Sequence, residues 1–255
     1  MKQPSRPLAT RLSLYAACLL LACTPASSAA GDAGAGPLGV SAVTVATARN
    51  ARVGALFAAG RRDRLRGSHF CTASVVHSPH RSLIVTAAHC LDARTGALVF
   101  VPGYRDGRAP YGVWSVRRWF LPRGWTEGRD EDSDVAFAVL GKRDGEGVED
   151  VVGANRFVTG AATGAETVTV TGYPDAREAP VSCANRPSPR GRTQQRLACP
   201  GFSGGTSGSP WVGGDGQVVG VLGGHQGGGS TADVSYSVVL GARAAALYRQ
   251  AARDP

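Results

Sequence analysis

The chain has 255 residues, enough for one all-β barrel domain or two small domains with a sizeable core. Its formal net charge is +9, and apart from Lys2 and Lys142 the basic residues are arginines scattered along the sequence. Scattered charge argues against a basic patch for nucleic acid or for a membrane surface. We therefore expect neither partner for the folded part of the chain.

The first 30 residues have the pattern of a secretory signal peptide. Three basic residues precede an apolar run at 12–22, whose 11 residues are too few to span a bilayer. Small residues follow, so we predict cleavage near Ala29 or Ala30 and a secreted, extracellular protein. Loss of this segment lowers the net charge from +9 to +6.

A lipoprotein signal is the alternative interpretation, because residues 20–23, Leu-Leu-Ala-Cys, are similar to a lipobox. Cleavage there would leave a lipidated Cys23 at the N-terminus and anchor the protein to a membrane. We rank this alternative second, since Leu21 is not the small or β-branched residue usual before the alanine.

The cysteines predict two disulfides. Cys18 and Cys23 are lost with the signal peptide, which leaves Cys71, Cys90, Cys183 and Cys199. Four cysteines in an exported chain allow three pairings. We predict the pairs Cys71–Cys90 and Cys183–Cys199, because each closes a short loop and such a loop contributes roughly 3 kcal/mol in the chain-entropy account.

Two patterns divide the rest of the chain. Residues 31–52 are rich in alanine and glycine, which is typical of a propeptide or a flexible N-terminal arm. Residues 53–255 show short apolar runs between Gly, Pro, Asp and Arg clusters, a pattern of antiparallel strands. The predicted strands are residues 53–58, 70–76, 82–86, 98–101, 112–117, 135–140, 167–171, 211–212, 217–222 and 234–240. An alanine-rich helix is predicted at 242–251.

Two side chains at the ends of predicted strands are candidates for proton transfer. His89 follows the apolar run 83–85 and precedes Cys90, so a disulfide would hold it more rigidly than a loop histidine. Asp134 opens the run 135–140, where a carboxylate is costly unless it accepts a hydrogen bond, for example from an imidazole. The acids at 130–132 lack an apolar context, and we expect them to be solvated. A lone histidine would be interpreted as structural, but His89 is accompanied by the other candidates in this chain.

Residues 201–211, Gly-Phe-Ser-Gly-Gly-Thr-Ser-Gly-Ser-Pro-Trp, form the third candidate. Four glycines and the absence of charge argue against a helix. Glycines beside Ser207 allow main-chain N–H groups to converge on one point, where they would stabilise an oxyanion next to a serine nucleophile. Taken alone, the stretch is also compatible with a flexible Gly/Ser linker.

Together these residues resemble the chymotrypsin-like serine proteases, whose histidine, aspartate and serine follow in this order. The resemblance rests on Thr86-Ala87-Ala88-His89-Cys90, on Asp134 before an apolar strand and on Gly205-Thr206-Ser207-Gly208-Ser209-Pro210, and it covers roughly residues 53–251. The serine motif and Gly224-His225-Gln226-Gly227-Gly228 are most similar to the bacterial V8-type, glutamyl endopeptidase branch.

The resemblance implies an all-β fold of two six-stranded antiparallel β-barrels with a C-terminal helix and a site in the cleft between the barrels. It implies Ser207 as the nucleophile of an endopeptidase, His89 as its base and Asp134 as the group that orients His89. The N–H groups of Gly205 and Ser207 would form the oxyanion hole. We expect protein or peptide substrates, a monomer, no cofactor and no metal ion.

Other positions bear on activation and specificity. Thr206 stands where animal digestive members have an aspartate that pairs with the freed N-terminus, and Gly201 stands where the trypsin branch has an acid, so we expect neither that ion pair nor cleavage after Arg or Lys. His225, with Gly227 beside it, is implied to hold a substrate carboxylate. Phe202 would narrow that pocket, and a structural role for His225 is equally compatible with the sequence.

Parts of the sequence are compatible with two other functions. Gly201-Phe202-Ser203-Gly204-Gly205 matches the nucleophile elbow of an α/β-hydrolase esterase, with Asp215 and His225 downstream. An elbow needs a helix directly after its serine, whereas this chain continues with glycines and Pro210. A catalytically inactive binding protein on the protease fold is the other alternative, and the presence of all three catalytic side chains favours the active enzyme over it.

Overall fold

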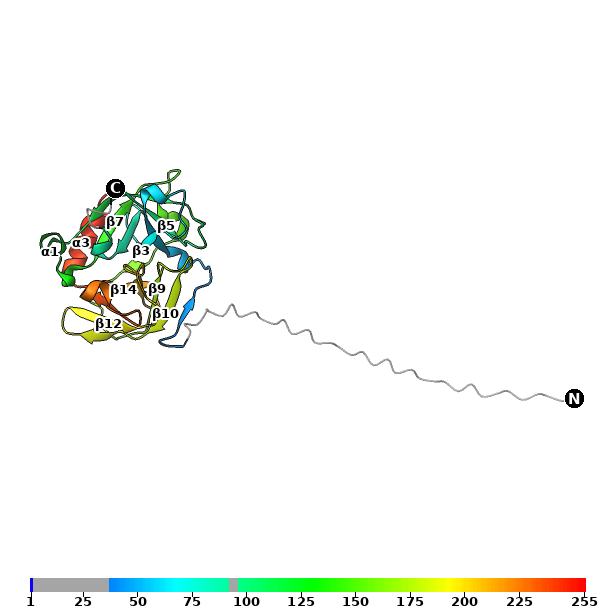
Figure 1. Cartoon of the computed structure of the whole chain (residues 1–255). Coiled ribbons are helices and arrows are strands. Elements are labelled where there is room, and N and C mark those ends of the chain that lie inside the picture. Colours follow the sequence, from blue (N-terminus) through cyan, green and yellow to red (C-terminus); the bar gives the residue numbers. More distant parts are fainter. Residues whose placement is uncertain (2–36, 92–95) are drawn as a thin grey trace. The chain divides into compact units, whose positions relative to one another are not determined.

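The computed structural model of the chain describes Met1 and residues 37–91 and 96–255 (Figure 1). The predicted signal peptide beyond Met1, with Cys18, Cys23 and the proposed cleavage sites, lies outside these described residues. Among the helices of the described ranges, none has the length and apolar character needed to cross a membrane.

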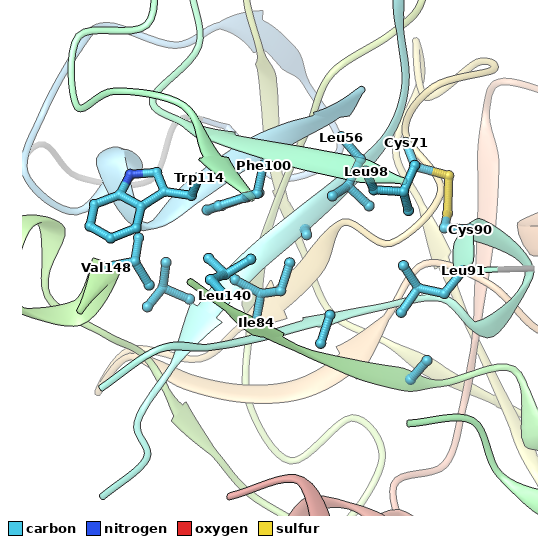
Figure 2. Close-up of a cluster of buried hydrophobic side chains, with 14 of the residues drawn as sticks. Leu56, Cys71, Ile84, Cys90, Leu91, Leu98, Phe100, Trp114, Leu140 and Val148 are labelled. Carbon is cyan, nitrogen blue, oxygen red and sulfur yellow. A yellow bond between two sulfur atoms is a disulfide. The ribbon is translucent and has the colours of Figure 1, made fainter. Parts of the chain in front are cut away.

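The N-terminal half of the fold is a closed antiparallel barrel (Figure 1). Its strands are β2 (Val53–Ala58), β3 (His69–Val76), β4 (Leu83–Thr86), β5 (Leu98–Pro102), β6 (Trp114–Phe120) and β7 (Ala136–Leu140). They pair in the order β2-β3-β4-β7-β6-β5. Successive strand residues face opposite sides, so one set points inwards. Leu56, Ile84, Phe100 and Trp114 belong to this buried cluster, which includes the Cys71–Cys90 disulfide (Figure 2).

The C-terminal half consists of two sheets. One has six strands in the order β1-β10-β9-β13-β14-β8, and the other has three in the order β11-β12-β15. The bounds are β1 (Ser41–Val43), β8 (Arg156–Phe157), β9 (Val168–Gly172), β10 (Val181–Asn185), β11 (Ser188–Arg190), β12 (Gln194–Ala198), β13 (Pro210–Val212), β14 (Gln217–Val221) and β15 (Val234–Val238). The predicted all-β class is thereby confirmed, with a closed barrel in one half and two sheets in the other.

The strands β10, β11 and β12 are not predicted from the sequence, because their apolar pattern is weak. β12 begins with Gln194 and Gln195, which are nevertheless buried, at 7% and 4% exposure. The Gln195 Nε2 group donates to the Val219 carbonyl at 3.1 Å, so burial leaves this amide hydrogen-bonded. A strand whose buried side chains are polar resembles a loop in sequence. β1 lies in the predicted N-terminal arm, and its residues Ser41–Val43 pair with β10.

Helices occupy the connections and the C-terminus. They are α1 (Arg123–Gly128), α2 (Val148–Val152), α3 (Ala242–Ala252) and the 3-10 helices η1 (Asn50–Arg52), η2 (Ala59–Arg61), η3 (Ala88–Leu91), η5 (Glu131–Ser133) and η6 (His225–Gly228). The α3 helix confirms the predicted C-terminal helix. Ala244, Leu247 and Ala251 bury one of its faces in a cluster with residues of β7, and the Tyr248 hydroxyl donates to the His77 carbonyl at 2.7 Å.

Both predicted disulfides, Cys71–Cys90 and Cys183–Cys199, are formed. The second joins β10 to the residue after β12 across a sequence separation of 16. We expect the double variant Cys183→Ala, Cys199→Ala to lower the free energy of unfolding by about 3 kcal/mol, because the unfolded chain regains the entropy of the open loop. Urea unfolding measures this effect. An unchanged midpoint and slope in non-reducing buffer would contradict it, and wild-type protein in reductant gives the reference for loss of both bridges.

Candidate active site

His89 and Asp134 form a hydrogen-bonded pair at one end of the barrel, in which Asp134 is buried and His89 is partly exposed. His89 lies in η3 directly after β4, and Asp134 lies between η5 and β7. The Asp134 carboxylate is 1% exposed; its Oδ2 is 2.7 Å from His89 Nδ1, and its Oδ1 accepts from the His89 main-chain N–H at 3.0 Å. Since a carboxylate only accepts, Nδ1 carries a proton, and in the neutral ring the lone pair is then on Nε2. This imidazole is therefore oriented to accept a proton at Nε2.

A third donor to Asp134 comes from the other half of the fold. The main-chain N–H of Gly224 donates to Asp134 Oδ2 at 2.7 Å. Three donors compensate the carboxylate for its loss of water. The preceding residue, Gly223, lies so close that a Cβ there would stand 2.9 Å from Asp134 Oδ2 and 3.1 Å from the Ala87 Cβ. The segment at 223–224 thus seals the His89–Asp134 pair from the side of the C-terminal half.

The serine loop, defined as residues 201–209, packs against the middle of β3 and the end of β4. Gly208 has φ +86°, and a Cβ there would lie 2.0 Å from the Thr72 carbonyl oxygen and 3.2 Å from the Ala87 nitrogen. The carbonyl of Ser207, one residue earlier, accepts the Thr72 N–H at 2.7 Å. Ala87 is two residues before His89 in the chain. The fold therefore brings Ser207, which is partly exposed, to the same edge of the barrel as the His89–Asp134 pair.

The two main-chain N–H groups predicted to form the oxyanion hole, those of Gly205 and Ser207, have no protein acceptor among the described residues, as is also true of Gly201, Ser203 and Gly204 in the same loop. The carbonyls of the same peptides are bonded on their opposite sides: Gly204 O accepts Asp175 N–H at 2.7 Å, and Thr206 O accepts the Ser209 hydroxyl at 2.7 Å. In a trans peptide the C=O and N–H point in opposite directions. The held carbonyls thus fix the direction of both free donors.

His225 is engaged by protein groups on both ring nitrogens. Nδ1 is 3.2 Å from Glu131 Oε2, and Nε2 is 2.7 Å from Arg190 Nη2. Its ring edge faces Tyr236, with centroids 5.0 Å apart. The side chain is therefore part of a link between η5, β11 and β15, which is the structural interpretation allowed by the sequence. Its role as a substrate contact stays a prediction.

The other two predicted substrate contacts differ in exposure. Phe202 is 5% exposed and packs in the core cluster that contains Trp211 and Leu222. Gly227 is exposed in η6, and its N–H donates to the Gly224 carbonyl at 2.9 Å. A substrate would therefore meet the main chain of Gly227 more readily than the ring of Phe202.

The acids at 130–132 are exposed but not merely solvated, which corrects the expectation from sequence. Asp130 Oδ1 accepts from the Asp132 N–H at 3.1 Å, and Glu131 Oε1 accepts from the Gln226 N–H at 2.8 Å. Asp132 Oδ1 accepts from Gln194 Nε2 at 2.8 Å. The bonds of Glu131 and Asp132 tie the loop that carries Asp134 to the C-terminal half. The sequence offers no signal for these two bonds, because their partners lie 95 and 62 positions away.

A metal ion has little to bind at this site. Cys71, His89 and Cys90 place ligand atoms within 4.8 Å of one another, and no other such group occurs among the described residues. Both sulfurs are bonded to each other, so neither is the thiolate that a metal would require. The His89 ring instead lies beside the Trp125 ring of α1, with centroids 6.3 Å apart.

Several known proteins with this architecture are proteases. Residues 67–221 match the trypsin-like peptidase domain family. The chain is similar to the protease Anisep from Arthrobacter nicotinovorans, at 30% identity and a TM-score of 0.69 over 80% of this chain and 96% of that one. It is also similar to the thermostable serine protease AL20 from an extremophilic microorganism, at 26% identity and a TM-score of 0.70 over 82% and 100%. No curated protein sequence matches the chain.

A Glu endopeptidase shares the fold at 17% identity and a TM-score of 0.66, over 86% of this chain and 99% of that chain. The family match and the similar structures thus support a peptidase. The chain belongs to the trypsin-like peptidase domain family, which confirms the resemblance to chymotrypsin-like proteases. The α/β-hydrolase alternative is wrong, because the fold is all-β and the chain after Ser203 runs through a loop into strand β13 instead of a helix.

Proposed function

We propose that the chain is a secreted serine endopeptidase that hydrolyses peptide bonds of protein or peptide substrates through Ser207, His89 and Asp134. The observation that carries this proposal is the hydrogen-bonded His89–Asp134 pair, whose Nε2 has no partner among the described residues, at the edge of the barrel where the serine loop packs. The free N–H groups of Gly205 and Ser207 support it, because an oxyanion hole needs two donors that no protein group occupies.

The reaction follows from these groups. Ser207 Oγ attacks the carbonyl carbon of the scissile peptide and passes its proton to His89 Nε2, while Asp134 stabilises the imidazolium through Nδ1. The carbonyl oxygen becomes an oxyanion, to which Gly205 and Ser207 donate. Collapse of the tetrahedral species breaks the C–N bond; the leaving amine takes the proton from Nε2, and an acyl-enzyme remains. Water, deprotonated by His89, then releases the acid and restores Ser207.

Export of the protein is part of the same proposal. Two disulfides suit an oxidising compartment outside the cytosol. The signal peptide predicted at residues 1–30 would deliver the chain there, with lipid attachment at Cys23 as the minor alternative. We propose that the enzyme acts as a monomer.

Ser207→Ala is expected to abolish casein hydrolysis and labelling by a fluorophosphonate, since the nucleophilic oxygen is removed. The matched control is Ser203→Ala in the same loop, whose exposed side chain makes no hydrogen bond among the described residues; it should keep wild-type activity and labelling. Equal activity of Ser207→Ala and wild type would overturn the proposal. An inactive, unlabelled wild-type protein would point instead to a binding protein on a protease fold.

A further inference from the structure

Thr72 belongs to strand β3 of the barrel, yet its N–H and its hydroxyl both form hydrogen bonds with residues of the C-terminal half. The residue is fully buried, at 0% exposure. Its N–H donates to the Ser207 carbonyl at 2.7 Å, and its Oγ1 donates to the Gly205 carbonyl at 3.0 Å. The same Oγ1 accepts the Tyr173 N–H at 3.0 Å. One threonine side chain therefore joins the serine loop to the segment at 173–175.

The serine loop needs such a contact because Gly205 has no side chain that could fix its conformation. With φ +86° and no side chain, this residue has access to backbone conformations closed to other residues. Its orientation depends on the two peptides that flank it. The peptide before Gly205 is held by Asp175 N–H on Gly204 O at 2.7 Å, and the peptide after it by the Thr72 hydroxyl on Gly205 O.

Thr72 makes the second of these bonds and is hydrogen-bonded to the segment that makes the first. Asp175 is two residues after Tyr173, whose N–H is bonded to the Thr72 hydroxyl. A Cβ on Gly205 would lie 2.6 Å from the Tyr173 carbonyl oxygen and 2.7 Å from the Asp175 nitrogen, so the loop and this segment are in direct contact. The segment is fixed in turn by the main barrel, since Tyr173 OH donates to Val53 O at 3.3 Å and His69 Nε2 bonds Pro174 O at 2.9 Å.

The barrel also fixes Thr72 itself. The Thr86 hydroxyl at the end of β4 donates to the Thr72 carbonyl at 2.7 Å, and Thr72 pairs with Ala55 in the β2–β3 ladder. Burial raises the pKa of Tyr173, so its phenol stays protonated and remains a donor to Val53. Thr72 is therefore held by the barrel, and its hydroxyl is hydrogen-bonded to Gly205, whose N–H must point in one direction.

We propose that Thr72 is the positioning residue of the oxyanion hole: its hydroxyl holds the Gly205–Thr206 peptide directly and supports, through the segment at 173–175, the Gly204–Gly205 peptide that presents the Gly205 N–H to the transition state. This inference rests on the proposed serine peptidase function. It assigns to Thr72 a contribution to kcat that is separate from substrate binding, because a substrate in the ground state does not need the two N–H groups as strongly as the oxyanion does.

The test compares Thr72→Val, which keeps the shape but removes the hydroxyl, with Thr72→Ser, which keeps the hydroxyl. Kinetics on a peptide amide substrate are expressed per active site titrated with fluorophosphonate, so that unfolded protein does not count. We expect Thr72→Val to lower kcat roughly 10- to 100-fold with little change in KM, somewhat less than direct loss of one oxyanion donor. Thr72→Ser should restore most of kcat.

A second readout is the affinity for a peptide aldehyde, whose adduct with Ser207 carries an oxygen in the oxyanion hole. To form it, the Ser207 hydroxyl adds across the aldehyde C=O, and its proton moves to His89 or to the new oxygen. Inhibition of the Thr72→Val variant by the aldehyde should weaken in parallel with the fall in kcat. The matched control is Thr171→Val, a buried strand threonine whose hydroxyl bonds the Ser182 hydroxyl and not the serine loop. It should change stability but neither kcat nor aldehyde affinity.

Wild-type kcat and aldehyde affinity in Thr72→Val would overturn the inference while leaving the peptidase intact. Equal kcat losses in the Val and Ser variants would also overturn it, since the effect would then be one of packing. If Thr72→Val does not fold, Thr72→Ala gives the same comparison with a smaller side chain. Failure of the proposed function itself has a different signature, a wild-type protein with no fluorophosphonate labelling at Ser207.

Discussion

Asp134→Asn is expected to lower kcat for peptide hydrolysis by about 10⁴-fold, with a much smaller effect on KM. The wild-type carboxylate accepts three hydrogen bonds, two from His89 and one from Gly224. An amide has one oxygen that can accept and one NH2 group that can only donate, so it cannot accept from all three donors. The variant therefore either repels one donor or favours the His89 tautomer with its proton on Nε2, which cannot accept a proton from Ser207.

The matched control is Asp132→Asn. Asp132 lies in the same loop and is exposed, and its oxygen would still accept from Gln194 Nε2. We expect this variant to keep kcat within about twofold of wild type, as is usual for exposed positions outside a buried network. Steady-state kinetics on a chromogenic peptide measure both. A loss in Asp134→Asn of less than about tenfold would mean that the carboxylate does not orient the base.

Gly208→Ala is expected to have an equally large effect through sterics. The new Cβ would lie 2.0 Å from the Thr72 carbonyl oxygen and 2.1 Å from Thr86 Oγ1, and the first of these is main chain that cannot move aside. The serine loop must then leave its seat against β3 and β4, which displaces Ser207. We expect loss of at least about 10³-fold in kcat together with a lower melting temperature, as for overpacked buried sites with strained backbone.

Gly201→Ala separates the steric effect from backbone strain. Gly201 has a similar φ of +82° in the same loop, but nothing lies within 4 Å of its added Cβ. Its expected cost is therefore the left-handed conformation alone, about 1–2 kcal/mol of stability, with activity largely retained. Similar activity losses in the two alanine variants would show that backbone strain, and not the contact with Thr72, limits this loop.

The strands of the barrel half can be predicted from sequence, because their residues either alternate between apolar and polar or are continuously apolar. The prediction for 53–58 coincides with β2, and the strand ends place His89 and Asp134 where the structure has them. Both disulfides follow from spacing. The C-terminal half is less accessible, since Gln194 and Gln195 are buried and polar and carry no hydrophobic signal.

Contacts distant in sequence explain the remaining gaps at the site. The bond from Thr72 to Gly205 joins positions 133 apart, and that from Gly224 to Asp134 positions 90 apart. A threonine in a strand is common, so no motif marks Thr72 as a partner of a glycine in a distant loop. The link from Glu131 through His225 to Arg190 is invisible for the same reason, and this is why the acids at 130–132 were expected to be solvated.

Because both halves of the fold donate hydrogen bonds to the Asp134 carboxylate, activity and secondary structure should be lost at different stages of unfolding. Two of its hydrogen-bond donors belong to the barrel and one to the segment that follows β14. A slight parting of the two halves therefore admits water to this ion long before either half melts. In mild denaturant or on gentle warming, turnover should vanish while the circular dichroism of the strands is still that of the native molecule.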